Sequence, residues 1–189
     1  MAKIKYGIKN CHYAVATIAS NGSATYSTPK ALPGAVSISL DAQGDTSPFY
    51  ADNIVYYTSV ANNGYEGDLE LALIPDDFYK DCLGYAADAN SVLYEDAGAA
   101  PVHFALTFQF ENDDGARRHV LYNCVATRPT LSGSTKEDSI EPQTETINIT
   151  ATTIYDAGYD KDIVKASCTT TQTTAYNSWN STIYTVTTS

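Results

Sequence analysis

Carboxylates are the side chains best placed to do chemistry in this sequence, and six of them fall within residues 64–85, which read GYEGDLELALIPDDFYKDCLGY. The first three alternate along a segment with strand character and the rest follow a proline: Glu66, Asp68, Glu70, Asp76, Asp77 and Asp81. Glycoside hydrolysis needs two carboxyl groups that face each other across a cleft, about 5–10 Å apart. Alternate residues of a strand lie about 7 Å apart but on the same face. The pattern therefore disfavours a catalytic pair and favours the polar face of a strand.

The other nucleophilic and metal-binding side chains do not form a motif. They are scattered, at Cys11, Cys82, Cys124, Cys168, His12, His103 and His119. Neighbours on a strand point to opposite faces, so Cys11 and His12 do not supply half of a zinc site, which needs four suitably spaced ligands. The turn Asn112–Gly115 is too short for a calcium loop. The sequence also has no phosphate-binding, nucleophile-elbow or zinc-protease motif, so the residues indicate no known catalytic motif and no metal site.

Charge narrows the range of partners. The formal net charge is −11, from 22 Asp and Glu against 11 Lys and Arg. Such a chain is repelled by phosphate backbones and lacks the basic patch that nucleic-acid readers use. The N-terminus has lysines without an apolar stretch, and no run is long and apolar enough to span a membrane. We expect no signal peptide, no membrane insertion, and cysteines that are free thiols.

Alternation of apolar and polar residues predicts two strands in the first half of the chain. The shared apolar face carries Val36, Ile38 and Leu40 in the first strand, and Leu69, Leu71 and Leu73 in the second. Between them we expect a long polar loop over residues 41–53, strand character over residues 49–60 with its centre at residues 54–57, and a turn at Asn62-Asn63-Gly64.

One short helix is expected after the second of these strands. A proline ends the strand, and the carboxylate of Asp76 or Asp77 can cap a helix by accepting hydrogen bonds from its first N–H groups. Phe78 and Cys82 lie one helical turn apart, and Gly84 supplies a left-handed stop. The helix should therefore span about two turns.

The second half of the chain predicts a hairpin and a further strand. Residues 103–110 and 118–128 flank the turn at Asn112–Gly115, a polar loop follows over residues 129–142, and residues 143–155 form a strand rich in Thr and Ile. Together the elements predict a single domain over residues 1–189. It is mainly β, a β-sandwich or partial barrel with one short α-helix.

The last segment, residues 167–189, carries no charged side chain and contains Trp179. A free arm or edge strand of this kind favours self-association, because its N–H and C=O groups are unpaired and no charge guards them. The same pattern fits an arm that folds back as a buried strand, and periodicity does not choose between the two.

Three blocks of the sequence resemble major tail tube proteins of phages with long, non-contractile tails (siphophages). They are YADNIVYYTSVANNGYEGDLELALIPDDFYKDCLGY (residues 50–85), FALTFQFENDDGARRHVLYNCVATRP (104–129) and VKASCTTTQTTAYNSWNSTIYTV (164–186). The first is similar to the family signature in which A-D-N-x-x-Y leads to G-Y-x-G-x-L-E and then to I-P-D-x-F. The second is similar to the family's second hairpin, and the third to its C-terminal segment.

The resemblance implies a structural virion protein that is not an enzyme and needs no cofactor. Such proteins form hexameric rings that stack into a hollow tube, in which the subunits build a continuous inner β-barrel with the helix outside. The implied partners are other copies of the chain, a tape-measure protein, and tail-terminator and distal-tail proteins. The implied location is the virion tail, after synthesis and assembly in the bacterial cytoplasm. DNA passes through such a tube without sequence recognition, and acids on the lumen limit sticking.

On this basis we expect two sets of assembly residues. The loop over residues 41–53 and the arm over residues 167–189 are candidate subunit interfaces, through Asp41, Asp45, Pro48, Tyr50, Asp52, Asn53, Tyr176, Trp179 and Tyr184. The acids Glu66, Asp68 and Glu70 are expected to face the lumen or a neighbouring subunit. The loop should be mobile in an isolated subunit and ordered by a neighbour, and deleting the arm should block tube formation while the core still folds.

Two other functions fit parts of the same sequence. A lectin-like or adhesin-like β-sandwich on a virion or cell surface would use a concave aromatic site, with Tyr56, Tyr57 or Trp179. A glycosidase-like enzyme is the weaker of the two. An activity that is lost on Glu66→Gln or Glu70→Gln would be needed to support it.

Overall fold

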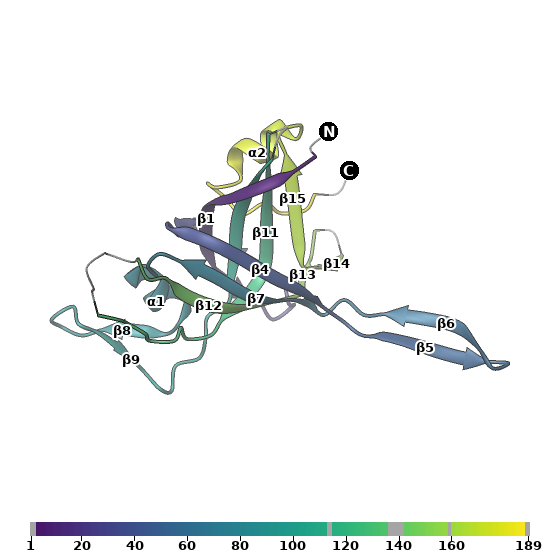
Figure 1. Cartoon of the computed structure of the whole chain (residues 1–189), viewed down its shortest axis with the longest axis horizontal. Coiled ribbons are helices and arrows are strands. Elements are labelled where there is room, and N and C mark those ends of the chain that lie inside the picture. Colours follow the sequence, from purple (N-terminus) through teal and green to yellow (C-terminus); the bar gives the residue numbers. More distant parts are fainter. Residues whose placement is uncertain (1–2, 113–114, 136–141, 159, 188–189) are drawn as a thin grey trace.

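The computed structural model describes residues 3–112, 115–135, 142–158 and 160–187. Strands dominate this part of the chain, and two short helices accompany them (Figure 1). The elements are β1 (Lys5–Ile18), β2 (Ala24–Tyr26), β3 (Lys30–Ala31), β4 (Ala35–Gln43), β5 (Thr46–Ala51), β6 (Ile54–Val60), β7 (Gly64–Leu71), α1 (Asp76–Cys82), β8 (Tyr85–Ala87), β9 (Leu93–Glu95), β10 (Phe104–Asn112), β11 (Gly115–Ala126), β12 (Glu145–Thr152), β13 (Ile154–Asp156), β14 (Lys161–Ile163), β15 (Lys165–Thr169) and α2 (Thr173–Ser178).

One large antiparallel sheet organises the body. Nine strands join in the order β2-β1-β10-β11-β12-β7-β4, with β3 paired to β1 and β15 paired to β11. The long strand β11 connects its two halves, because Arg117–Leu121 pairs with β15 and Asn123–Ala126 pairs with β12. Strands β12, β7 and β4 cross the rest of the sheet in Figure 1, and the sheet does not close into a barrel. The prediction of a mainly β, sandwich-like domain is confirmed.

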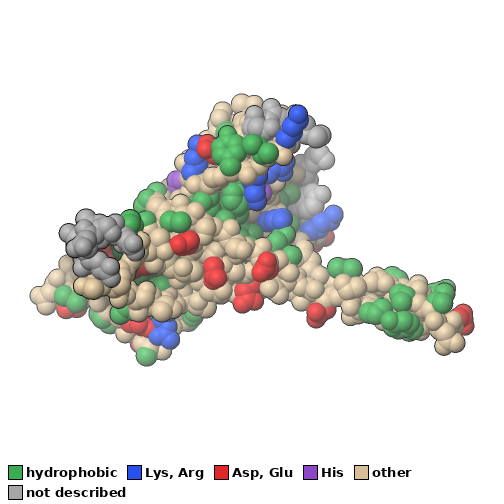
Figure 2. All heavy atoms as spheres, viewed as in Figure 1, with side chains coloured by type: hydrophobic (Ala, Val, Ile, Leu, Met, Phe, Trp, Pro, Cys, Tyr) green, Lys and Arg blue, Asp and Glu red, His purple; other side chains and the backbone are tan. Residues whose placement is uncertain are grey.

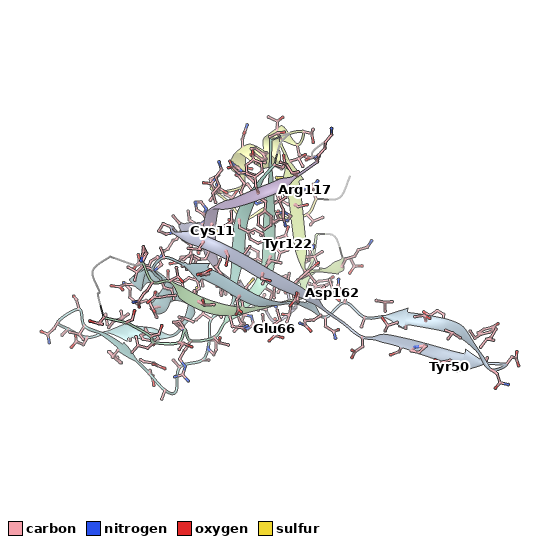
Figure 3. All side chains as sticks on the ribbon, viewed as in Figure 1. Cys11, Tyr50, Glu66, Arg117, Tyr122 and Asp162 are labelled. Carbon is pink, nitrogen blue, oxygen red and sulfur yellow. The ribbon has the colours of Figure 1, made fainter. Side chains whose placement is uncertain are left out.

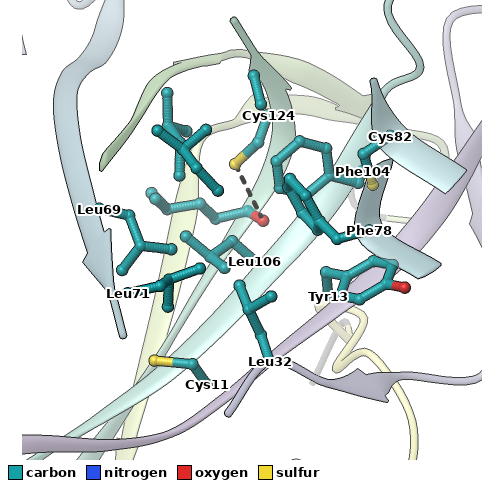
Figure 4. Close-up of a cluster of buried hydrophobic side chains, with 14 of the residues drawn as sticks. Cys11, Tyr13, Leu32, Leu69, Leu71, Phe78, Cys82, Phe104, Leu106 and Cys124 are labelled. Carbon is teal, nitrogen blue, oxygen red and sulfur yellow. Dashed lines mark hydrogen bonds between the residues drawn. The ribbon is translucent and has the colours of Figure 1, made fainter. Parts of the chain in front are cut away.

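Apolar side chains fill the space between the two halves of the sheet, together with α1 (Figure 4). Phe78 of α1 is fully buried, and its ring centroid lies 5.0 Å from that of Tyr13 and 5.5 Å from that of Phe104. Leu69 and Leu71 of β7 face the same cluster. Losing a buried aromatic ring such as Phe78 costs about 3–5 kcal/mol. This packing fixes which face of β7 points away from the core.

The N-terminus of α1 differs from the prediction. Pro75 takes the N-cap position in an extended conformation, and no side chain forms a cap hydrogen bond. The prediction that Asp76 or Asp77 caps the helix is wrong, because both lie inside the first turn, where a carboxylate favours the positive end of the helix dipole. Asp77 pairs with Lys80 at 2.8 Å. Gly84, with φ of +76°, ends the helix as predicted.

Residues 41–53 are not a loop. Strand β4 continues to Gln43, and β5 and β6 then form a two-stranded hairpin that extends far from the body (Figure 1). Its turn is Asp52-Asn53, with φ of +52° and +59°, and positive φ at both central positions is what a type I′ hairpin turn requires. Asp and Asn enter this region more readily than most residues. The turn is therefore encoded in a dipeptide that also suits a polar loop.

The C-terminal segment folds back onto the body instead of forming a free arm. Strand β15 pairs with β11, and α2 follows as a second helix that the sequence pattern does not predict. Trp179 is 2% exposed, and its Nε1 donates a hydrogen bond of 3.2 Å to the carbonyl oxygen of His119. Trp179 joins a second hydrophobic cluster with Tyr122 and Ile183. Because the segment supplies part of the core, we no longer expect the core to fold without residues 167–189.

Two apolar side chains that the alternation places in the core are exposed. Leu73 is 69% exposed because β7 ends at Leu71. Val36 is 49% exposed because the register of β4 on β7 shifts beside it, and an irregularity of this kind re-aims a side chain. Ile38 and Leu40 pack against the core cluster as predicted.

Predictions for the second half of the chain hold where they can be compared. The hairpin is present as β10 and β11, with Asn112 paired to Gly115, and the predicted strand over residues 143–155 contains β12. Residues 113–114 of the hairpin turn and 136–141 of the following loop lie outside the described residues. In the part of the chain that is described, no helix is long and apolar enough to cross a membrane.

Candidate assembly surfaces

The three alternating acids lie on the outward face of β7, at the centre of a surface formed by β4, β7 and β12 (Figure 3 labels Glu66). Their register partners are Asp41, Ser39 and Ser37 on β4, and Thr150, Asn148 and Thr146 on β12. The reverse face of β7 carries the buried Leu69 and Leu71, and α1 packs there. The face with the acids is therefore open, and we call it the acidic face.

Neighbouring polar side chains hold two of these acids in place. The two carboxylate oxygens of Glu70 accept hydrogen bonds from Thr144 at 2.6 Å and from Ser37 at 2.8 Å. These bonds favour the ionised form and hold the pKa of Glu70 below its ordinary value. Asp68 accepts a bond of 3.2 Å from the Asn148 amide. The negative charges are thus fixed on the sheet by its own strands.

Asp41 and Glu66 place like charges directly opposite each other on β4 and β7. Such a pair destabilises a sheet by about 0.2–1 kcal/mol. The sequence has no Lys or Arg from Ala31 to Tyr79, so these two strands contain no base to offset the repulsion. A charge pattern that costs stability indicates a role for the acidic face as a whole.

The geometry of this surface does not match that of a catalytic carboxylate pair. Glu66 and Asp68 are exposed on a single sheet face, so they do not oppose each other across a cleft. Among the described residues, no three His, Cys, Asp or Glu side chains lie close enough together to hold a metal ion. Burial raises the pKa of the Cys11 thiol to about 12 and also raises that of Cys168, so neither is a ready nucleophile.

The β5–β6 hairpin displays apolar and aromatic side chains on a ribbon whose strands pair only with each other (Figure 2). Seven of them are more than half exposed: Phe49, Tyr50, Ile54, Val55, Tyr56, Tyr57 and Val60. An isolated two-stranded hairpin is marginally stable in water, and contiguous exposed apolar surface marks an interaction site. The hairpin is therefore the clearest candidate for a contact with another molecule.

The base of the hairpin is fixed to the body by close backbone contacts. A Cβ at Gly44 would lie 2.0 Å from the carbonyl oxygen of Ala61, so only glycine fits where the strands leave the sheet. The Ala61 N–H donates a hydrogen bond of 3.0 Å to the Asp45 carbonyl, and the Asn63 N–H donates one of 2.9 Å to Gln43. The two strands therefore stay paired with each other where they leave the sheet.

The structure separates the predicted interface residues into two groups. Those from the first segment are all exposed and lie on the hairpin or its base: Asp41, Asp45, Pro48, Tyr50, Asp52 and Asn53. Those from the C-terminal segment are turned toward the body. Trp179 stacks on Tyr184 with ring centroids 5.4 Å apart, and the Arg118 guanidinium lies 3.9 Å from the centroid of the Tyr176 ring. Trp179 is buried, whereas Tyr176 and Tyr184 remain partly exposed.

The sequence pattern does not predict one cluster, in which basic side chains surround an aromatic hollow. Lys5, Lys165 and Arg117 come from three different strands and lie around an aromatic hollow that includes Phe110 and His119. Only their common pairing to β10 and β11 brings them together. The sequence gives one hint of this cluster. No Lys or Arg occurs from Ala31 to Tyr79, so the basic side chains must lie on other parts of the molecule.

Comparison with known proteins gives one result of wide coverage. A family model described as phage tail tube protein matches residues 1–187. No curated protein matches the sequence. The family match spans both the blocks that resemble tail tube proteins and the N-terminal region that does not.

Proposed function

Because the chain belongs to the phage tail tube protein family, we propose that it is the major tube subunit of a long, non-contractile tail. In this proposal, copies of the chain form hexameric rings, and the rings stack into the conduit through which DNA leaves the capsid. The subunit catalyses no reaction and is made and assembled in the bacterial cytoplasm.

The acidic face of β4, β7 and β12 is the observation that carries this proposal. It is an open strand surface whose ionised groups on β4 and β7 are all carboxylates, and its reverse side is closed by the core and α1. Turned toward the lumen, it repels phosphate and lets DNA slide without recognition. The same orientation puts α1 on the outside.

Contacts between subunits use other parts of the molecule. The hairpin, with Asp45 at its base and Pro48, Tyr50, Asp52 and Asn53 along it, reaches beyond the body toward a neighbour. Asp41 lies on β4, close to where that strand leads into the hairpin, and adds to the same contact. Strand β4 ends the strand order of the sheet, so a neighbouring strand can pair along it and extend the sheet into a shared barrel. A tape-measure protein occupies the lumen during assembly, and terminator and distal-tail proteins cap the ends.

Electron microscopy of the concentrated, purified protein tests the tube itself. We expect rings or tubes, with six subunits in each ring by mass measurement. A protein that stays monomeric at every salt and protein concentration would overturn the proposal.

A matched pair of charge reversals tests which side faces the lumen. Glu66→Lys/Asp68→Lys adds positive charge to the acidic face, and Asp76→Lys/Asp77→Lys adds the same charge beside α1. Tubes of the first variant should retain short duplex DNA that is protected from nuclease, whereas DNA on the second should be digested. Equal digestion on both variants would place the acidic face outside the lumen.

A further inference from the structure

An apolar groove lies where β4 passes over β10 and β11. Two adjoining hollows, of about 280 and 240 Å³, share Lys5, Phe110 and His119. The larger hollow is also lined by apolar side chains of four strands, β4, β7, β10 and β11, among them Ile38, Leu40, Tyr65 and Phe108. Its volume falls just below the range of about 300–1,000 Å³ that small-molecule sites occupy. The groove is therefore sized for a few side chains of a protein partner.

Basic side chains frame this groove. Lys5 Nζ lies 4.3 Å from the centroid of the Phe110 ring, and Lys165 Nζ lies 4.3 Å from that of Tyr65. Arg117 lines the smaller hollow. His119 stacks on Phe108 at 5.2 Å, and its burial, together with the nearby cations, lowers its pKa to about 4. At neutral pH the histidine therefore adds aromatic surface, and the positive charge comes from the rim.

The hairpin has the complementary chemistry. It combines exposed aromatic side chains with Asp52 at its turn and Asp45 at its base, and it contains no Lys or Arg. Figure 2 shows most bases over the upper part of the body, and acids along the β4–β7–β12 surface and at the hairpin end. Ile38 and Leu40 of the groove wall belong to β4, which leads directly away into the hairpin (Figure 1). A hairpin so directed does not reach the groove of its own chain.

We propose that the hairpin turn of one copy of the chain docks into the groove of a second copy. Aromatic side chains from the hairpin enter the hollow, and the Asp52 carboxylate lies beside the ammonium groups of Lys5 and Lys165. This inference rests on the proposed tube function, because it names the surface that receives the hairpin there. It joins two different patches of the same chain, which makes the contact head-to-tail and able to propagate.

Cysteine cross-linking tests the contact directly, because Cys11, Cys82, Cys124 and Cys168 are all buried. Asn53→Cys and Lys165→Cys, combined in one chain and oxidised in the assembled state, should give a ladder of disulfide-linked multimers on a non-reducing gel. The control is Asn53→Cys with Lys80→Cys, since Lys80 is exposed on α1 and does not line either hollow. The control should stop at dimers. A ladder from the control, or none from the test pair in tubes, overturns the proposal.

A charge swap gives an independent test in tubes of a chain without introduced cysteines. Asp52→Lys alone and Lys165→Asp alone should each raise the concentration needed for assembly by roughly tenfold, a loss of about 1.4 kcal/mol per contact. The chain with both changes should recover part of the loss, since the charges again oppose each other. If wild-type tubes form and both single variants assemble normally, the groove assignment fails while the tube function stands. If the Asn53→Cys/Lys165→Cys chain cross-links as predicted but wild-type protein never forms tubes, the contact stands and the tube function fails.

Discussion

The hairpin and the C-terminal segment are alike in sequence and opposite in structure. The hairpin is rich in Tyr and the C-terminal segment in Thr, both carry aromatic residues and little or no charge, and both suggest assembly elements. Yet the hairpin exposes Tyr56 at 71%, whereas the C-terminal segment buries Trp179 to 2%. An aromatic segment with few charges therefore indicates burial, but its sequence does not show whether its own chain or a partner covers it. One of these segments is buried by its own chain, and we propose that the other is buried by a neighbour.

Two deletions test the contrast between the C-terminal segment and the hairpin, and they have the largest expected effects. Removing residues 167–189 takes away Trp179, Ile183 and part of β15, so the remaining chain should not fold cooperatively. Removing residues 46–60 and joining Asp45 to Ala61 through an Asn-Gly turn should leave a folded body, because those two residues are already hydrogen bonded. Circular dichroism melting curves measure both outcomes.

The same pair of deletions has a clear contrary result. If the chain without residues 167–189 melts cooperatively near the wild-type temperature, the C-terminal segment is not part of the core. If the chain without the hairpin loses its melting transition, the hairpin is more than a surface projection. We also expect that the hairpin deletion abolishes tubes although its body is intact.

Single aromatic substitutions show the contrast at smaller scale. Trp179→Ala should lower the free energy of unfolding by about 3–5 kcal/mol, because it empties a buried site and removes the hydrogen bond to His119. Tyr56→Ala should change it by about 0.5 kcal/mol or less, as expected for an exposed side chain. Urea denaturation of the two variants under conditions where the protein is monomeric gives both values. Equal losses would remove the distinction between the segments.

The sequence predicted the elements better than their positions. Alternation correctly identified β4, β7 and β12, and the glycine stop correctly ended α1. It misplaced Val36 and Leu73, because one register shift and one early strand end break the period of two. It predicted β6 correctly but assigned β5 and the hairpin turn to a loop, because Asp52-Asn53 and Pro48 suit either structure and the neighbouring apolar residues gave no core face to align with.

The candidate surfaces were predictable only where they lie on one strand. Glu66, Asp68 and Glu70 share a face by spacing alone, so the acidic face was visible in the sequence. The groove was not, because Lys5, Phe110 and Lys165 are far apart in the chain and meet only through strand pairing. Trp179 was misjudged for a related reason. Trp179 packs in a cluster with residues of β1, β10 and β11, and no local sequence pattern predicts that these strands contact it.

Limited proteolysis of the wild-type chain compares how accessible the hairpin and the C-terminal segment are. In dilute, monomeric protein, chymotrypsin should cut first within residues 49–57, where four aromatic residues are exposed on a marginally stable ribbon. The aromatic residues of the C-terminal segment should resist until the chain unfolds. Trypsin is the control, because the sequence has no Lys or Arg from Ala31 to Tyr79. In tubes the chymotryptic cuts should disappear, and equal cutting in monomers and tubes would show that no neighbour covers the hairpin.

The smallest expected effect concerns the hairpin turn. Asn53 has φ of +59°, a conformation that a β-branched side chain strongly disfavours, so Asn53→Val should weaken the turn by about 1–2 kcal/mol. Asn53→Gly is the matched control, because glycine adopts positive φ freely. Hydrogen exchange should show the amides of β6 opening about 5–30 times more often in Asn53→Val than in Asn53→Gly. Amides of β15 should exchange equally in both variants, because that strand belongs to the body and opens with it. If β15 exchange rises with that of β6, the hairpin and the body unfold as one unit, and the division between a projecting element and a core element fails.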